Sequence, residues 1–73
     1  MSNDDYDYEQ ARRNTLEQAY PNDVYNTQEL KAKFEVKSFA APYVFVKRKS
    51  DGAEGFLRFE HMPRFYFGWS PNG

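Results

Sequence analysis

Two runs of alternating side chains flank the pair Asp51-Gly52, and this arrangement constrains the fold more than any other stretch of the chain. The runs are "APYVFVKRK" before the pair and "FLRFEHM" after it. Side chains alternate between the two faces of a strand, and Asp-Gly is typical of a hairpin turn. The stretch therefore predicts a β-hairpin. The apolar residues on one of its faces are Val44, Val46, Leu57 and Phe59.

A third run, "RFYFGW", follows Pro63, which breaks the ladder of the preceding strand. Its alternation places Phe65, Phe67 and Trp69 on one side and Arg64 and Tyr66 on the other. We predict antiparallel strands over residues 42–69 and a loop over the tail, residues 70–73. A fourth strand forms if residues 35–39 also extend.

The N-terminal segment, residues 1–20, predicts an acidic helix over residues 4–20 that Pro21 stops. Ser2 or Asn3 can cap it, and acidic side chains in the first turn complement the helix dipole. Its apolar stripe is thin, and we expect the first turn to fray.

A second helix is predicted over residues 26–35. Asn26 stands at the N-cap and Glu29 at the third helical position, as in a capping box. Leu30 and Phe34 lie one turn apart on a single face. The 73 residues make one small domain, residues 1–73, of the α+β class. We predict that the two short helices pack on one face of a three-stranded, or four-stranded, antiparallel meander.

The residue types present argue against an enzyme, a metal site and a cofactor. The chain has no cysteine, and its one histidine, His61, falls on a strand face beside apolar residues. Gly52 and Gly55 fit a hairpin rather than a phosphate-binding loop, and no nucleophile motif is present. No apolar run is long enough to span a bilayer, and the acidic N-terminus is unlike a signal peptide. We expect a cytoplasmic, non-enzymatic protein that binds no membrane.

Charge is unevenly distributed along the chain. Residues 1–29 hold seven acids against two arginines, and residues 30–73 hold eight bases against four acids. The acidic start can simply favour the helix dipole, dock on a basic protein surface, or imitate nucleic acid. As an auxiliary contact with a partner it offers Asp4, Asp5, Tyr6, Asp7 and Tyr8.

Aromatic residues make up 19% of the chain, more than so small a core readily hides. A sheet that helices cover on one face leaves its other face open, and large exposed aromatic patches mark partner sites. We therefore predict a protein-interaction module, such as an adaptor, inhibitor or assembly component, that binds a protein or a second copy of itself. The predicted partner-binding residues are Tyr43, Phe45, Phe56, Arg58, Arg64 and Tyr66.

The alternative hypothesis is a weak binder of single-stranded nucleic acid, with bases stacked on the same rings. Its basic contacts would be Lys47, Arg48 and Lys49, although lysines beside a hairpin also protect sheet edges. A helix-turn-helix is disfavoured because Pro42 falls within its required recognition helix. In general style, short, cysteine-free and aromatic-rich, the chain resembles bacteriophage accessory proteins, and this resemblance assigns no residue.

Overall fold

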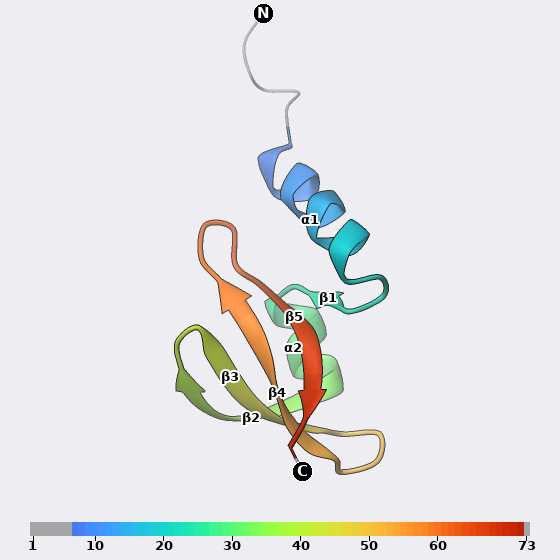
Figure 1. The fold of residues 1–73 in the computed structure, drawn as a ribbon, viewed down its shortest axis with the longest axis vertical. Coiled ribbons are helices and arrows are strands. Elements are labelled where there is room, and N and C mark those ends of the chain that lie inside the picture. Colours follow the sequence, from blue (N-terminus) through green and yellow to red (C-terminus); the bar gives the residue numbers. More distant parts are fainter. Residues whose placement is uncertain (1–6, 73) are drawn as a thin grey trace, which may run out of the picture.

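The computed structural model describes residues 7–72, which form two helices and five strands (Figure 1). The helices are α1 (Tyr8–Ala19) and α2 (Thr27–Lys33). The strands are β1 (Val24–Tyr25), β2 (Phe34–Ala40), β3 (Tyr43–Arg48), β4 (Glu54–Glu60) and β5 (Phe65–Pro71). Neither helix is long and apolar enough to cross a membrane.

The strands form one antiparallel sheet in the order β1-β5-β4-β3-β2. Strands β2 to β5 follow one another along the chain and across the sheet, so the predicted α+β fold with an antiparallel meander is confirmed. The predicted strand number of three or four is wrong. β2 begins at Phe34, directly after α2, and β1 lies in the connector between the helices, where Val24 pairs with Phe67.

The two helices lie on opposite faces of the sheet, which corrects the prediction that they share one. Residues paired across antiparallel strands share a face, and the pairs Val44–Leu57 and Val24–Phe67 mark the two faces. On the α2 face the buried cluster comprises Leu30, Phe34, Val44, Val46, Leu57, Phe59 and Tyr66. On the α1 face it comprises Leu16, Val24, Phe65 and Phe67. Figure 1 shows α2 behind the sheet and α1 at one end of it, beside β1.

Phe65 and Phe67 lie on one side of β5 and Tyr66 on the other, as predicted, but the prediction that Tyr66 is exposed is wrong. Tyr66 pairs with Phe59 and is buried on the α2 face, with 3% of its surface exposed. Phe65 and Phe67 point to the α1 face, where Leu16 covers them. Both faces of β5 are buried because α1 covers the face opposite to α2. Tyr66 is therefore buried although it points away from Phe65 and Phe67.

A bulge in β5 adds one residue to the strand and so turns the side chain of Trp69 to the α2 face, opposite to Phe65 and Phe67. The β4–β5 register shifts between Phe56 and Arg58, and Gly68 adopts a φ of 76° on the β5 side. This left-handed conformation favours glycine. Trp69 consequently packs on Phe34, with 5.4 Å between ring centroids.

The predicted helix starts are confirmed for α2 and corrected for α1. In α2 the backbone N–H of Glu29 donates to Asn26 Oδ1 (2.8 Å) and the N–H of Asn26 donates to Glu29 Oε1 (2.9 Å), which completes the capping box. The helix stops at Lys33 because the next residue is extended and enters β2. α1 starts at Tyr8, whereas the predicted helix starts at residue 4. The side chain of Asp7 caps α1 by accepting from the N–H of Gln10 (2.9 Å). The predicted caps Ser2 and Asn3 lie outside the described residues.

Two arginines attach α1 to the rest of the domain. Arg12 Nε and Nη2 donate to the carboxylate of Glu60 at 2.6 and 2.8 Å, a bidentate pair. Arg13 Nη2 pairs with Glu29 (2.8 Å) and donates to the carbonyl oxygen of Val24 (3.1 Å). Leu16 is the buried residue of the helix. Charged contacts and the buried side chain of Leu16 together attach α1 to the domain.

We expect the stability of the domain to fall at acidic pH. Hydrogen bonds from Arg12 hold the pKa of Glu60 below its ordinary value, and the backbone N–H of Asn26 does the same for the pKa of Glu29. A carboxylate whose pKa is lowered by folding stabilises the fold above its unfolded pKa, and this stabilisation is lost as the pH falls through the folded pKa. Urea unfolding should therefore show that the free energy of unfolding decreases as the pH falls below 4.5, the ordinary pKa of a glutamate.

A Glu60→Gln variant separates the Arg12 pair from the other carboxylates. At neutral pH it should be less stable than the parent chain by roughly 0.5–1 kcal/mol, because the pair is partly exposed. The difference should disappear at low pH, where Glu60 itself is protonated. A difference that stays constant with pH would show that the variant acts through packing rather than charge.

Candidate functional site

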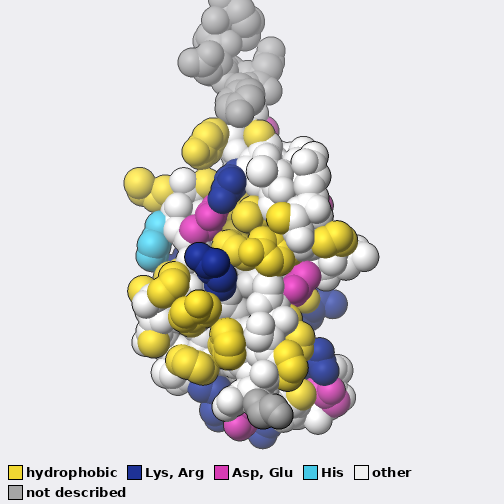
Figure 2. Space-filling view, in the orientation of Figure 1, with side chains coloured by type: hydrophobic (Ala, Val, Ile, Leu, Met, Phe, Trp, Pro, Cys, Tyr) yellow, Lys and Arg dark blue, Asp and Glu magenta, His cyan; other side chains and the backbone are white. Residues whose placement is uncertain are grey.

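A group of three aromatic side chains and one arginine lies on the α1 face, over β3 and β4. It consists of Tyr43, Phe45, Phe56 and Arg58, and we call it the β3–β4 patch. The ring of Phe56 lies 5.3 Å from that of Tyr43 and 5.9 Å from that of Phe45, both edge to face. Tyr43 and Phe45 are 38% and 37% exposed. Figure 2 shows hydrophobic side chains gathered at the lower left of this face. Exposed rings in mutual contact are typical of a surface that binds another molecule.

Of the two cations at the patch, Lys47 has acidic cross-strand neighbours and Arg58 has none. Lys47, at the end of the patch, has Glu35 of β2 and Glu54 of β4 as its direct cross-strand neighbours. Arg58 instead lies between two uncharged side chains, Tyr43 and Phe67, and is exposed. Arg58 is therefore the cation of the patch that has no acidic cross-strand neighbour.

Two of the six predicted partner-binding residues lie on the other face. Tyr66 is in the core, as described above. Arg64 is exposed in the turn before β5, and its guanidinium lies 5.3 Å from the ring centre of Phe59 and 5.7 Å from that of Phe39. The structure thus joins four of the predicted residues into one surface and assigns Arg64 and Tyr66 to the α2 side.

The predicted acidic contact is only partly within the described residues. Asp4, Asp5 and Tyr6 lie outside them, whereas Asp7 caps α1 and Tyr8 is 60% exposed in its first turn. The start of α1 lies at the far end of the molecule from the β3–β4 turn (Figure 1). Asp7 and Tyr8 therefore lie far from the basic residues of that turn.

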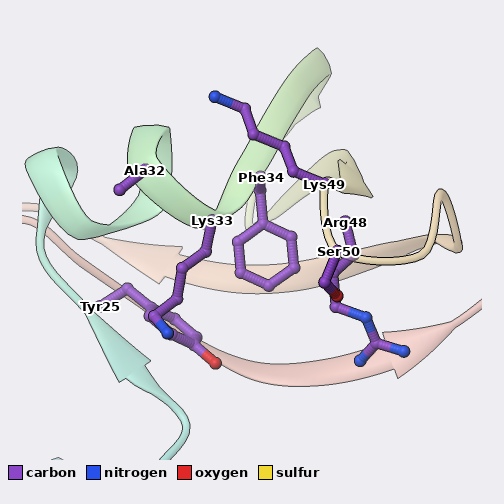
Figure 3. Close-up of a pocket in the computed structure, with 7 residues that line it drawn as sticks. All are labelled: Tyr25, Ala32, Lys33, Phe34, Arg48, Lys49 and Ser50. Carbon is purple, nitrogen blue, oxygen red and sulfur yellow. The ribbon is translucent and has the colours of Figure 1, made fainter.

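The basic run is divided between the two faces of the sheet. Lys47 belongs to the α1 face, whereas Arg48 pairs with Phe34 on the α2 face. Arg48 and Lys49 meet Lys33 of α2 around a cleft of about 430 Å³. The cleft is lined by Tyr25, Ala32, Lys33, Phe34, Arg48, Lys49 and Ser50. In Figure 3 the ring of Phe34 lies between Lys33 and Tyr25 on one side and Arg48 and Ser50 on the other.

Backbone and side-chain hydrogen bonds hold the two walls of the cleft together. The N–H of Lys49 donates to the carbonyl oxygen of Lys33 (2.9 Å), and Lys49 Nζ donates to that of Lys31 (2.7 Å). The β3–β4 turn is thereby fixed to the last turn of α2. Burial raises the pKa of Tyr25, and the carboxylate of Asp23 raises it further, so the phenol stays protonated at neutral pH.

Arg48 is held in place from two directions. Its Nε and Nη2 donate to the carboxylate of Asp51 at 3.0 and 2.8 Å, and these bonds lower the pKa of Asp51 to about 2. Its guanidinium lies 4.9 Å from the ring centre of Trp69. The position of Arg48 is therefore coupled to the environment of the tryptophan.

His61 lies outside both surfaces. It is exposed in the turn after β4, with its ring 5.4 Å from that of Phe59. Within residues 7–72, no three histidine or acidic side chains gather closely enough to hold a metal ion.

Sequence reasoning did not predict the cleft. Its lining comes from β1, α2, β2, the end of β3 and the β3–β4 turn, which only the tertiary fold brings together. One available indication was the pair Lys31 and Lys33 in the last turn of the second helix, where cations also stabilise the helix dipole. Comparison of the chain with protein-family models, curated proteins and solved structures gives no match.

Proposed function

We propose that the protein is a non-enzymatic interaction module that binds a partner protein through the β3–β4 patch. The observation that supports this proposal is the mutual contact of three aromatic rings, with exposed Arg58 as the cross-strand neighbour of Tyr43, on the half of the sheet face that α1 leaves open. Tyrosine and arginine are favoured in the energetic centres of protein interfaces. The partner would supply apolar side chains for the rings and a carboxylate for Arg58.

The charges favour a protein over single-stranded nucleic acid at this surface. A nucleic acid would need several cations beside the rings, and the patch has one, Arg58. Here Lys47 lies between two glutamates, and Arg48 and Lys49 point to the α2 side. The carboxylates that a second copy would bring beside its patch, Glu35 and Glu54, are cross-strand neighbours of its own Lys47, so we favour a partner of different sequence as the source of a carboxylate for Arg58.

Site-specific photo-crosslinking tests the proposal. A photoreactive phenylalanine analogue at position 45 should capture one protein from a lysate of the organism that encodes the chain, and the same analogue at exposed Gln28 on α2 should not. The captured protein, once purified, should bind the unmodified chain in a calorimetric titration. Tyr43→Ala and Arg58→Glu should each weaken this affinity about tenfold or more, as expected of residues at an interface centre.

Lys31→Ala is the matched control, because it removes an exposed side chain of α2, away from the patch, and should leave the affinity within about twofold. Circular dichroism checks that each variant keeps its fold. The proposal fails if position 45 yields no product, if the product is a second copy of the chain, or if the patch variants bind the partner as tightly as the parent.

A further inference from the structure

The cleft between α2 and the β3–β4 turn has the composition of an anion site. Its lining includes three cationic side chains, Lys33, Arg48 and Lys49, and no carboxylate. Ser50 adds a hydroxyl group, whereas the hydroxyl of Tyr25 donates to the carboxylate of Asp23. We propose that this cleft binds the terminal phosphate of an organic phosphate of the nucleotide class, either free or at the end of a nucleic-acid strand.

The hydrogen bonds around the cleft leave donors for such a phosphate. Lys33 is exposed and makes no ion pair within the described part of the chain. Arg48 bonds Asp51 through Nε and Nη2, so its Nη1 group stays available. Lys49 uses its ammonium on one carbonyl oxygen and retains two further N–H groups. Cationic N–H donors on fixed walls suit a phosphate because charge-assisted hydrogen bonds are the strong ones.

The shape of the cleft favours an organic phosphate over a bare anion. Its volume of about 430 Å³ falls in the range of small-molecule sites. The rings of Tyr25 and Phe34 contact each other edge to face at 5.4 Å and provide an apolar wall beside the cations. A sugar or base can contact this wall while the phosphate contacts Lys33 and Arg48.

The single tryptophan of the chain reports on the cleft directly. Arg48 lies over Trp69, so a phosphate bound at the free Nη1 group of its guanidinium should change the tryptophan emission. We expect AMP and pyrophosphate to change Trp69 fluorescence saturably, and adenosine and sodium chloride at equal ionic strength to leave it unchanged. Oligothymidylate with a 5′ phosphate should bind more tightly than the same strand without it.

Two lysine variants distinguish the cleft from general positive charge. Lys33→Gln should weaken AMP binding about tenfold or more, since it removes a charged hydrogen-bond donor. Lys37→Gln removes the same charge from β2, outside the cleft, and should leave AMP affinity nearly unchanged.

The proposal is overturned if no phosphate probe exceeds the salt control, if AMP and adenosine act alike, or if the two lysine variants behave alike. Equal binding of the oligonucleotide with and without its 5′ phosphate would also contradict a terminal-phosphate site. Tyr43→Ala, which alters the other face, should leave AMP binding intact. The outcome is therefore independent of the proposed protein interface.

Discussion

Replacing Phe65 by alanine should abolish the cooperative unfolding transition of the domain. Phe65 is 1% exposed, belongs to the cluster under α1, and has the guanidinium of Arg13 5.9 Å from its ring centre. Removing a buried phenylalanine ring costs about 3–5 kcal/mol. A core of this size supplies only about 3–5 kcal/mol in total. Thermal and urea unfolding followed by circular dichroism should show a largely unfolded chain at room temperature.

Met62→Ala is the control for this prediction. Met62 lies in the turn just before Phe65 and is 87% exposed, so its removal should change the free energy of unfolding by no more than about 0.5 kcal/mol. Phe65→Ala with a stability close to that of Met62→Ala would show that α1 does not pack on β5. The position of the whole N-terminal helix would then be wrong.

Local sequence patterns predicted the parts of the fold that depend on neighbouring residues. The capping box of Asn26 and Glu29 formed as expected. The turn at Asp51 and Gly52 also formed, with Gly52 at a φ of 75° and the Asp51 carboxylate accepting from the N–H of Ala53 (3.1 Å). In each case the interacting groups are a few residues apart, so the chemistry of the turn or cap settles the structure.

The faces of β5 could not be read from its sequence. Phe65, Tyr66 and Phe67 are consecutive large aromatic residues, and all three are buried. A strand buried on both faces has no polar side to mark its orientation. The orientation depends instead on α1, whose thin stripe gave no indication of which sheet face it covers.

Long-range polar contacts explain why β1 was missed. Asp23 accepts the backbone N–H of Trp69 through its carboxylate (2.8 Å) and that of Gly68 through its carbonyl oxygen (3.3 Å). These bonds hold the connector against the edge of β5, where Val24 and Tyr25 then pair. In the sequence Val24 and Tyr25 are too short a run to indicate a strand, and they lie among the turn-forming residues of 21–26. The division of the partner-binding residues between two faces and the formation of the cleft also depend on contacts between segments that are far apart in the sequence.

Gly55→Ala should destabilise the domain and move the tryptophan ring. Gly55 is buried in β4 rather than in the hairpin turn, where the sequence suggested a role for it. A Cβ atom there would overlap the carbonyl oxygen of Ser70 and lie 2.7 Å from the Trp69 ring. Because the first obstacle is backbone, β5 itself must shift. We expect a loss at or above the upper end of about 1–3 kcal/mol, measured by urea unfolding.

The emission of Trp69 gives this prediction a second, local measurement. The ring packs on Phe34 and under Arg48, so its displacement should shift the emission spectrum and also weaken phosphate binding in the adjoining cleft. Glu54→Ala is the matched control, since it alters the exposed residue next to Gly55 and should preserve both emission and fold. If Gly55→Ala instead matches Glu54→Ala in stability and emission, β5 does not lie against Gly55. The β4–β5 register, which places Trp69 beside the cleft, would then be wrong.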